Sequence, residues 1–514
     1  MERTLNIPAL VQFIIYAIDY AFIFFILFFE RKESTRRFAW ILVLAFLPGV
    51  GIILYLLLSG NFFAGNRSMR EINRYVHEKA KPLFDEQRKL LSSPDERITK
   101  HIKEDYLPLI NMNLEKGNCP LLTANEPNLF LGGDTFFEDL CTQLESASES
   151  IHMEYFIFHK DAIGKRIMEI LCRKAKEGVS VKLIYDDLGS ILTPTRFFRR
   201  LNNAGGSARP FYQIRIGLPL TLNHRNHKKL TVIDSRIAYL GGINIGDEYA
   251  NRSKHRKLNW RDTVVKLSGD IVLDLQSRFL IDWHSLDAWH KRTKTEEKIQ
   301  QYFPQELVTE IYRQHDESET IRKIAPELFA HGSIFTQLLN AGPDDENKGK
   351  IEDAFIRMIM GAKKTVCIET PYFTPDEQFY TALKIASHTG VEVHVIIPRD
   401  WDKFFMKAAS SEFARQALRE GIHIHLYPGF IHSKLIVTDS ELSSIGTTNI
   451  DNRSFTLHFE QNVIFYDRKF SEKCQSVFDT DLAVSEEIGV DYYDKKPILA
   501  RAFWSFCKLF SPFL

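Results

Sequence analysis

The sequence predicts an α/β protein in which two pseudo-symmetric halves share one active site, behind an N-terminal hairpin of two transmembrane helices. A histidine and a lysine, two residues apart, open an apolar run twice, in NHRNHKKLTVIDSRIAYLGGINIGD at 223–247 and in IHSKLIVTDSELSSIGTTNID at 431–451. Strand-like and helical patterns recur around both copies, which predicts mixed β-sheets flanked by helices. Two long apolar runs precede them.

The first apolar run, Pro8 to Phe29, is long enough to cross a bilayer as a helix. The second, Phe38 to Leu58, follows after the short polar turn ERKESTRR. A cleaved signal peptide would need a basic n-region and a small-residue cleavage site, and neither precedes the second run. We therefore expect residues 1–65 to form a two-pass hairpin in the lipid bilayer.

Charge leaves open which side of the membrane the catalytic part faces. Basic residues in the loop at 31–37 favour a cytoplasmic loop, whereas those at 67–79 favour the opposite orientation. Asp19 lies in mid-span, where a carboxylate is costly, and this predicts either a functional or interhelical partner or a protonated side chain packed against the second helix.

Composition narrows the function classes. The 514 residues exceed what one core usually holds, and Lys+Arg equals Asp+Glu at 66 each, without the basic excess of most nucleic-acid binders. We expect no nucleic-acid partner. The six cysteines lie far apart without CxxC spacing, which predicts buried thiols in place of a zinc site or disulfide framework.

Each half repeats a strand–helix–strand pattern. In the first half the strands are Ile151 to Phe158 and Val179 to Asp187, and in the second they are Val366 to Phe373 and Val391 to Pro398. Each unit is too small to enclose a substrate. Pairing about a pseudo-twofold axis would bring the two His-Lys strands face to face.

Five further segments are expected after the hairpin. The halves occupy 125–285 and 348–485, joined by a charged linker at 286–347. A polar helical connector, 66–124, precedes them. The C-terminal segment 486–514 is amphipathic, and suits either docking on the core or an interfacial helix.

The two motif copies match at one constant offset. The pairs are His227 with His432, Lys229 with Lys434, Asp234 with Asp439, Gly241 with Gly446 and Asn244 with Asn449. On a strand, residues i and i+2 share a face, so each histidine points the same way as its lysine. A single HxK is most often surface decoration, but a doubled one with matching partners predicts chemistry.

His-x-Lys-x4-Asp followed by Gly-Gly-x-Asn or Gly-Thr-x-Asn, twice in one chain, resembles the phospholipase D superfamily. The segments NHRNHKKLTVID, GGINIGDEY, WRDT, ETPYFTPDE, GFIHSKLIVTD and GTTNIDNRSF are similar to those of bacterial cardiolipin synthases, and the likeness extends over nearly the whole chain. It implies phosphatidyl transfer between two phosphatidylglycerol molecules in a bacterial cell membrane, with release of glycerol. It also implies that His227 is the nucleophile and His432 the general acid.

The residue types fit this chemistry. Imidazole titrates near physiological pH, so one histidine attacks phosphorus while the other donates a proton to the departing alcohol. The two lysines, with Asn244 and Asn449, are expected to gather the phosphate oxygens and stabilise the transition state. The first product is a phosphohistidine, which a second alcohol or water consumes. Because the lysines supply positive charge, we expect neither a metal nor a cofactor.

Two sets of acids accompany the motifs. Asp234 and Asp439 belong to the catalytic pattern, but their odd offset from the histidines places them on the opposite face or in the turn, where they would hold a hairpin. Asp262 in NWRDTVVKL and Glu460 in HFEQNVIFY each begin a later strand of their own half. The resemblance implies that an acid in that place supports the histidine.

Other functions stay open at this stage. A membrane phospholipase D would hydrolyse its lipid, and a related transferase would use another donor such as phosphatidylethanolamine. A non-catalytic membrane scaffold would tolerate the loss of either histidine. The oligomeric state and the roles of 286–347 are not predicted.

Overall fold

The computed structural model describes residues 7–30, 34–58, 73–74, 81, 84–85, 87–89, 91–92, 102–213, 223–253, 258–286, 333–343 and 349–511. The chain forms two compact units, one built mainly from residues 1–64 and one from most of 65–512. Those residues of the expected connector at 66–124 and of the expected linker at 286–347 that are not in these ranges lie outside the described residues.

The N-terminal unit consists of α1 (Ile7–Phe28), α2 (Ser34–Phe46) and α3 (Val50–Leu58). Within α1, Leu10–Phe28 has a mean hydropathy of 2.2 and is long and apolar enough to cross a membrane. The second apolar run, expected to be one helix, is divided. Pro48 removes a backbone donor, and Gly49 takes a φ of 76°, which favours glycine. The described residues therefore contain one helix of spanning length, followed by two shorter ones.

Asp19 has a partner at this break. Its Oδ2 accepts a hydrogen bond from the backbone N–H of Gly49 at 2.9 Å, just before α3 begins. The first N–H groups of a helix have no partner within the helix, so the buried Asp19 side chain accepts from a donor that would otherwise lack one. The structure thus shows a contact between Asp19 and the second apolar run.

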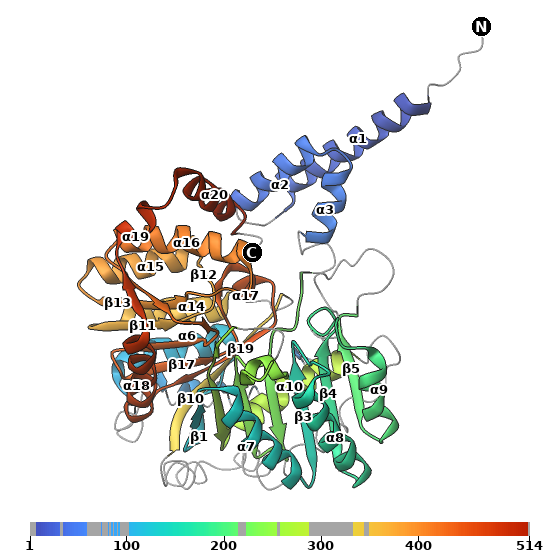
Figure 1. Ribbon diagram of the computed structural model, residues 1–514, viewed down its shortest axis with the longest axis vertical. Helices are drawn as coiled ribbons and strands as arrows, with labels where there is room; N and C mark the ends of the chain where they lie inside the picture. Colours follow the sequence, from blue (N-terminus) through green and yellow to red (C-terminus); the bar gives the residue numbers. More distant parts are fainter. Residues whose placement is uncertain are drawn as a thin grey trace. The chain divides into compact units, whose positions relative to one another are not determined.

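The second unit contains two mixed sheets (Figure 1). The first has seven strands in the order β2-β9-β7-β6-β3-β4-β5. Its strands are β2 (Asn128–Phe130), β3 (Ser150–Tyr155), β4 (Ser180–Asp186), β5 (Ser207–Phe211), β6 (Lys229–Ile233), β7 (Ile237–Gly241) and β9 (Val264–Ser268). Strands β3 and β4 are parallel, as the strand–helix–strand pattern predicted, and β5 adds a third parallel strand.

The other sheet has nine strands in the order β1-β10-β19-β17-β16-β11-β13-β14-β20. They are β1 (Leu122–Asn125), β10 (Ser333–Ala341), β11 (Thr365–Glu369), β13 (Glu392–Pro398), β14 (His423–Tyr427), β16 (Leu435–Thr438), β17 (Leu442–Gly446), β19 (Glu460–Phe465) and β20 (Glu486–Ile488). The parallel set β11, β13, β14 repeats that of the first sheet.

Helices cover both sheets, and one buried cluster joins them. Helices α7 (Gly133–Ser146), α8 (Ala162–Lys176) and α9 (Thr195–Asn203) pack on the first sheet, and α6 (Leu107–Gly117), α14 (Lys350–Gly361), α15 (Glu377–His388) and α16 (Phe404–Arg419) pack on the second. The buried cluster that joins the sheets contains residues of both sheets together with residues of α10 (Ile271–Ser285) and α18 (Arg468–Val484). The predicted two-half α/β architecture is confirmed.

Several segments that the sequence placed outside the halves contribute to the nine-stranded sheet. Strand β10, within the expected linker, is paired between β1 and β19. Helix α6, from the expected connector, packs against α14 and β10. The strand β20 and the helices α19 (Val490–Asp494) and α20 (Ile498–Leu509) belong to the C-terminal segment. Strand β20 pairs with β14, and α19 and α20 contact α16.

The motif aspartates hold the hairpin turns. Asp439 Oδ1 accepts the N–H groups of Lys364 and Thr365 at 2.7 and 2.9 Å, and Oδ2 accepts that of Lys363 at 2.8 Å. Asp234 makes the equivalent bonds at the start of β3. Asp439 and Ser440 have φ of 54° and 55°, as a two-residue hairpin turn requires. Each aspartate directly follows its strand and stands five residues after the motif lysine, about 16 Å along an extended chain.

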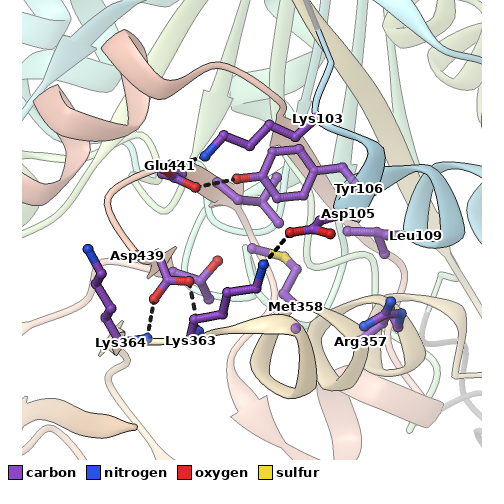
Figure 2. A pocket seen from close by; sticks show the side chains of 13 residues that line it. Lys103, Asp105, Tyr106, Leu109, Arg357, Met358, Lys363, Lys364, Asp439 and Glu441 are labelled. Carbon is purple, nitrogen blue, oxygen red and sulfur yellow. Dashed lines mark hydrogen bonds and ion pairs between the residues drawn. The ribbon is translucent and has the colours of Figure 1, made fainter. Parts of the chain in front are cut away.

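A pocket of about 180 Å³ adjoins Asp439, away from the histidines (Figure 2). Several of its polar side chains are paired with one another. The Tyr106 hydroxyl donates to Glu441 at 3.1 Å, the Lys103 amine lies 2.5 Å from the same carboxylate, and the Lys363 amine contacts Asp105. These bonds tie the turn to the chain before α6.

We predict that Asp439→Ala lowers the free energy of unfolding by roughly 2 to 3 kcal/mol, because three backbone donors lose a charged acceptor. Thermal unfolding of the detergent-purified chain measures this. Asp491→Ala is the control, since that side chain is 82% exposed. Lost turnover at unchanged stability would instead place Asp439 in the reaction.

Candidate active site

Backbone segments of each half hold the motif of the other half. Strand β8 (Trp260–Arg261) pairs in parallel with β15 (Phe430–Ile431), which ends one residue before the second motif. The N–H of His432 donates to the Arg261 carbonyl at 2.6 Å, and the N–H of His227 donates to the Phe459 carbonyl at 3.0 Å. Both histidines therefore lie where the halves cross.

The supporting acids also cross between the halves. His227 Nδ1 lies 2.8 Å from Glu460 Oε1, and His432 Nδ1 lies 2.7 Å from Asp262 Oδ2. The sequence identified both acids, but it gave no sign that each would contact the histidine of the opposite half. A carboxylate at Nδ1 keeps a proton on that nitrogen, which leaves Nε2 as the reacting atom.

Each lysine folds back on its own motif. Lys229 Nζ donates to the His227 carbonyl at 2.5 Å, and Lys434 Nζ donates to the His432 carbonyl and lies 2.8 Å from His432 Nδ1. Both histidines lie just before the strands β6 and β16, and each lies together with its lysine there, although the i, i+2 pairs are not within one strand as expected.

Burial shifts the titration of the whole cluster. It lowers the pKa of His432 to about 4, and lowers that of His227 well below its usual value, with the neighbouring lysines adding to both effects. It also lowers the pKa of Lys229 to about 7 and that of Lys434 to about 8. The lowered pKa values of the histidines and lysines all disfavour the positively charged forms. An anion bound among these groups would favour the charged forms and raise the pKa values again.

Asn244 and Asn449 are buried near the two motifs. Asn244 Oδ1 accepts the N–H of Ile157 at 3.0 Å, which orients its amide. Asn449 Oδ1 is buried and has no hydrogen-bond partner among the described residues. The contact of both asparagine side chains with the phosphate oxygens of a substrate stays a prediction.

Aromatic rings surround both histidines, and two of them were missed in the sequence. The ring of His458 lies 5.5 Å from that of His227, and its Nδ1 is 3.8 Å from Glu460 Oε1. Trp260 lies 5.1 Å from His432. Trp260 stands two residues before Asp262, just as His458 stands two before Glu460. This shared spacing was the available signal.

The comparisons with known proteins agree with this geometry. A family model described as "Cardiolipin synthase, PLD-like domain" matches residues 140–283 and 355–482, one segment in each half. A second, "Phospholipase_D-nuclease N-terminal", matches residues 17–60.

The chain belongs to the cardiolipin synthase family of the phospholipase D superfamily.

Relatives in this family match almost end to end. A cardiolipin synthase of Listeria innocua is 36% identical over 95% of each chain. Cardiolipin synthase 2 of Staphylococcus epidermidis is 34% identical over 97% of this chain and 96% of its own. A crystal structure of phosphatidylserine synthase from Haemophilus influenzae, 14% identical, matches 79% of this chain and 99% of its own with a TM-score of 0.57, which shows the shared fold.

One trio in the site has the geometry of a metal centre. His227, His458 and Glu460 offer ligand atoms within 4.8 Å of one another. However, Lys229 and Lys434 lie close enough to lower the pKa of His227 by their charge. A divalent cation there would meet the same repulsion, so this part of a cardiolipin synthase site suits an anion better.

We predict that Glu460→Gln lowers turnover roughly 10²- to 10⁴-fold, because the amide no longer balances the imidazolium that forms during reaction. Relative to the wild type, the same variant should become more stable as pH rises. Burial raises the Glu460 pKa from 4.5 to about 8, so the folded wild type binds this proton more tightly than the unfolded chain and loses stability across that window.

Thermal unfolding at several pH values across that window tests the second expectation. The midpoint of Glu460→Gln minus that of the wild type should grow with pH, because glutamine does not ionise. Glu472→Gln, at a side chain 51% exposed, is the control and should show no such trend. Parallel curves for Glu460→Gln and wild type would contradict the buried-carboxyl account.

Proposed function

We propose that this chain transfers a phosphatidyl group from one phosphatidylglycerol to another, giving cardiolipin and glycerol through a phosphohistidine. The observation that carries the proposal is the pair of carboxylate-supported histidines, each beside a buried lysine, at the crossing of the two halves. Family membership and near full-length relatives named cardiolipin synthase support it.

In the first step, Nε2 of neutral His227 attacks phosphorus in line with the departing glycerol oxygen. The phosphorus–nitrogen bond forms as the phosphorus–oxygen bond breaks, and protonated His432 gives its Nε2 proton to glycerol. The lysines and asparagines hold the non-bridging oxygens. Glu460 lies at Nδ1 of His227, where it balances the positive charge of the phosphorylated ring.

In the second step, His432 accepts the proton of a hydroxyl on the acceptor lipid. That oxygen attacks phosphorus, the phosphorus–nitrogen bond breaks, and His227 returns to its neutral form while His432 is again protonated. The depressed pKa of His432 suits the base of this step, and the anionic substrate raises its pKa for the acid of the first. The family resemblance supports this assignment of the two histidines.

The N-terminal unit supplies the membrane attachment. We propose a two-pass anchor in a bacterial cell membrane, with α1 as one pass and α2 with α3, divided at Pro48, as the other. We also propose that 125–285 and 348–485 are the two catalytic halves, with β1, α6 and β10 completing the second sheet.

We predict that the purified chain, given phosphatidylglycerol alone in EDTA, forms cardiolipin and glycerol in equal amounts. Mass spectrometry of the products measures both. Phosphatidic acid in place of cardiolipin would mean hydrolysis and would contradict the transferase proposal. Phosphatidylethanolamine supplied together with phosphatidylglycerol tests whether another donor is used.

His227→Ala and His432→Ala should each reduce turnover to background, and Lys229→Ala should lower transition-state stabilisation by roughly 3 to 4 kcal/mol. His388→Ala, at a side chain 53% exposed, is the matched control. Alkaline quenching during turnover, followed by peptide mass spectrometry, should find the phosphatidyl group on His227. Its appearance on His432 would reverse the two roles, and activity in either alanine variant would rule out the shared site.

A further inference from the structure

Helix α20 is apolar on both of its sides. Its inner side packs against α16, where Cys507 is buried with Ala408 and Ala409. Its outer side exposes large apolar side chains: Ile498 (73% exposed), Leu499 (81%), Phe506 (51%), Leu509 (72%) and, directly after the helix, Phe510 (40%). A surface helix of a soluble domain normally turns polar residues to water, so this outer side lacks an ordinary explanation.

The apolar surface continues onto the first turn of α16. Phe404 is 72% exposed, and its ring stacks on Phe503 of α20 with 5.5 Å between centroids. We call this surface the α16–α20 patch, made of Phe404, Ile498, Leu499, Phe506, Leu509 and Phe510. Figure 1 shows the two helices adjacent on one face of the second unit.

The charges at the edge of the patch are mainly basic. Helix α20 contains no acidic residue; its Arg501 lies at this border, whereas the Lys508 amine turns inward to Phe413 and Gln416 of α16. Lys403 and Lys407 flank Phe404, although the chain as a whole has a formal net charge of zero. The acids beside these basic residues already have partners: Asp494 Oδ1 lies 3.8 Å from Arg501 and its carboxylate also pairs with Arg419 on α16, and Asp402 accepts the Tyr372 hydroxyl. An apolar face with a basic border is the pattern of a helix that lies in an anionic lipid surface.

The patch begins beside the wall of the active site. The Lys403 amine lies 5.2 Å from the centre of the Tyr372 ring, and Phe404 follows directly in the chain. The Tyr372 ring is 6.4 Å from Phe430, which is 5.7 Å from His432. A bilayer in contact with the patch would therefore meet the same wall that lines the catalytic histidines.

We propose that the α16–α20 patch inserts into the surface of an anionic bilayer and presents the active site to lipid headgroups in that surface. The choice of an anionic lipid rests on the proposed function, whereas the insertion itself rests on the exposed apolar face and its basic border. The contact is separate from the N-terminal anchor. It would fix the orientation of the catalytic unit at the membrane.

The full chain, reconstituted in phosphatidylcholine vesicles, allows a direct test. Leu499→Glu with Leu509→Glu should lower turnover of long-chain phosphatidylglycerol in the same bilayer at least about tenfold, because two carboxylates disfavour insertion. Turnover of a short-chain phosphatidylglycerol dissolved in the buffer should stay within about twofold, since that lipid does not need the docked orientation. Equal losses on both substrates, or no loss on either, would overturn the proposal.

A control variant and a second measurement accompany this test. Met360→Glu with Val484→Glu adds the same charge at side chains that are 47% and 56% exposed outside the patch, and should change neither rate. The second measurement does not depend on activity. A fluorophore on Leu509→Cys, in a Cys172→Ser background, should be quenched by lipids that carry a nitroxide near the headgroup, and one on Val484→Cys should not.

Absence of quenching at position 509 would show that water or protein, such as the chain's own N-terminal helices or a second copy, covers this face, and it would overturn the proposal. Quenching together with a failure to make cardiolipin would leave the patch established and reject only the proposed reaction.

Discussion

The exchange of carboxylates between the two halves is the contact on which the site depends. Glu460 from the second half lies at His227, and Asp262 from the first lies at His432. Each histidine is also held by a backbone bond to the opposite half. An isolated half would keep its histidine and lysine but would lose the acid that fixes the proton on Nδ1. The site is therefore a property of the pair, which explains why one chain carries both copies.

Burial then determines what the paired site can bind. It lowers the pKa of both lysines and both histidines and raises that of Glu460. Groups held away from their preferred charge states gain most from a ligand of the right sign, because an anion among them offsets the cost of desolvation. A phosphodiester is such a ligand. The same groups make the site a weak point in stability, as buried catalytic charges commonly do.

The sequence predicted what depends on local pattern, and missed what depends on the pairing of distant segments. Strand spacing placed each histidine with its lysine, and the odd offset of Asp234 and Asp439 correctly indicated turns. The exchange of acids could not be read, because nothing in either strand specifies which half it meets. The sequence did not predict strand β10, because the segment around it is rich in charged residues. It also predicted one helix across Pro48, because the residues on both sides of Pro48 are apolar. The only sequence signal for His458 is its spacing, two residues before Glu460, which matches that of Trp260 before Asp262.

Trp260 and His458 also show where the pseudo-symmetry ends. Both flank a catalytic ring at similar distances, 5.1 Å and 5.5 Å, but only the imidazole of His458 is titratable, and its Nδ1 lies 3.8 Å from Glu460 Oε1. The carboxylates differ as well, a glutamate at His227 and an aspartate at His432. A reaction that uses one histidine as nucleophile and the other as acid needs such a difference, since identical surroundings would give both rings the same basicity. The duplicated motif provides two histidines, and the different residues beside them allow one to act as nucleophile and the other as acid.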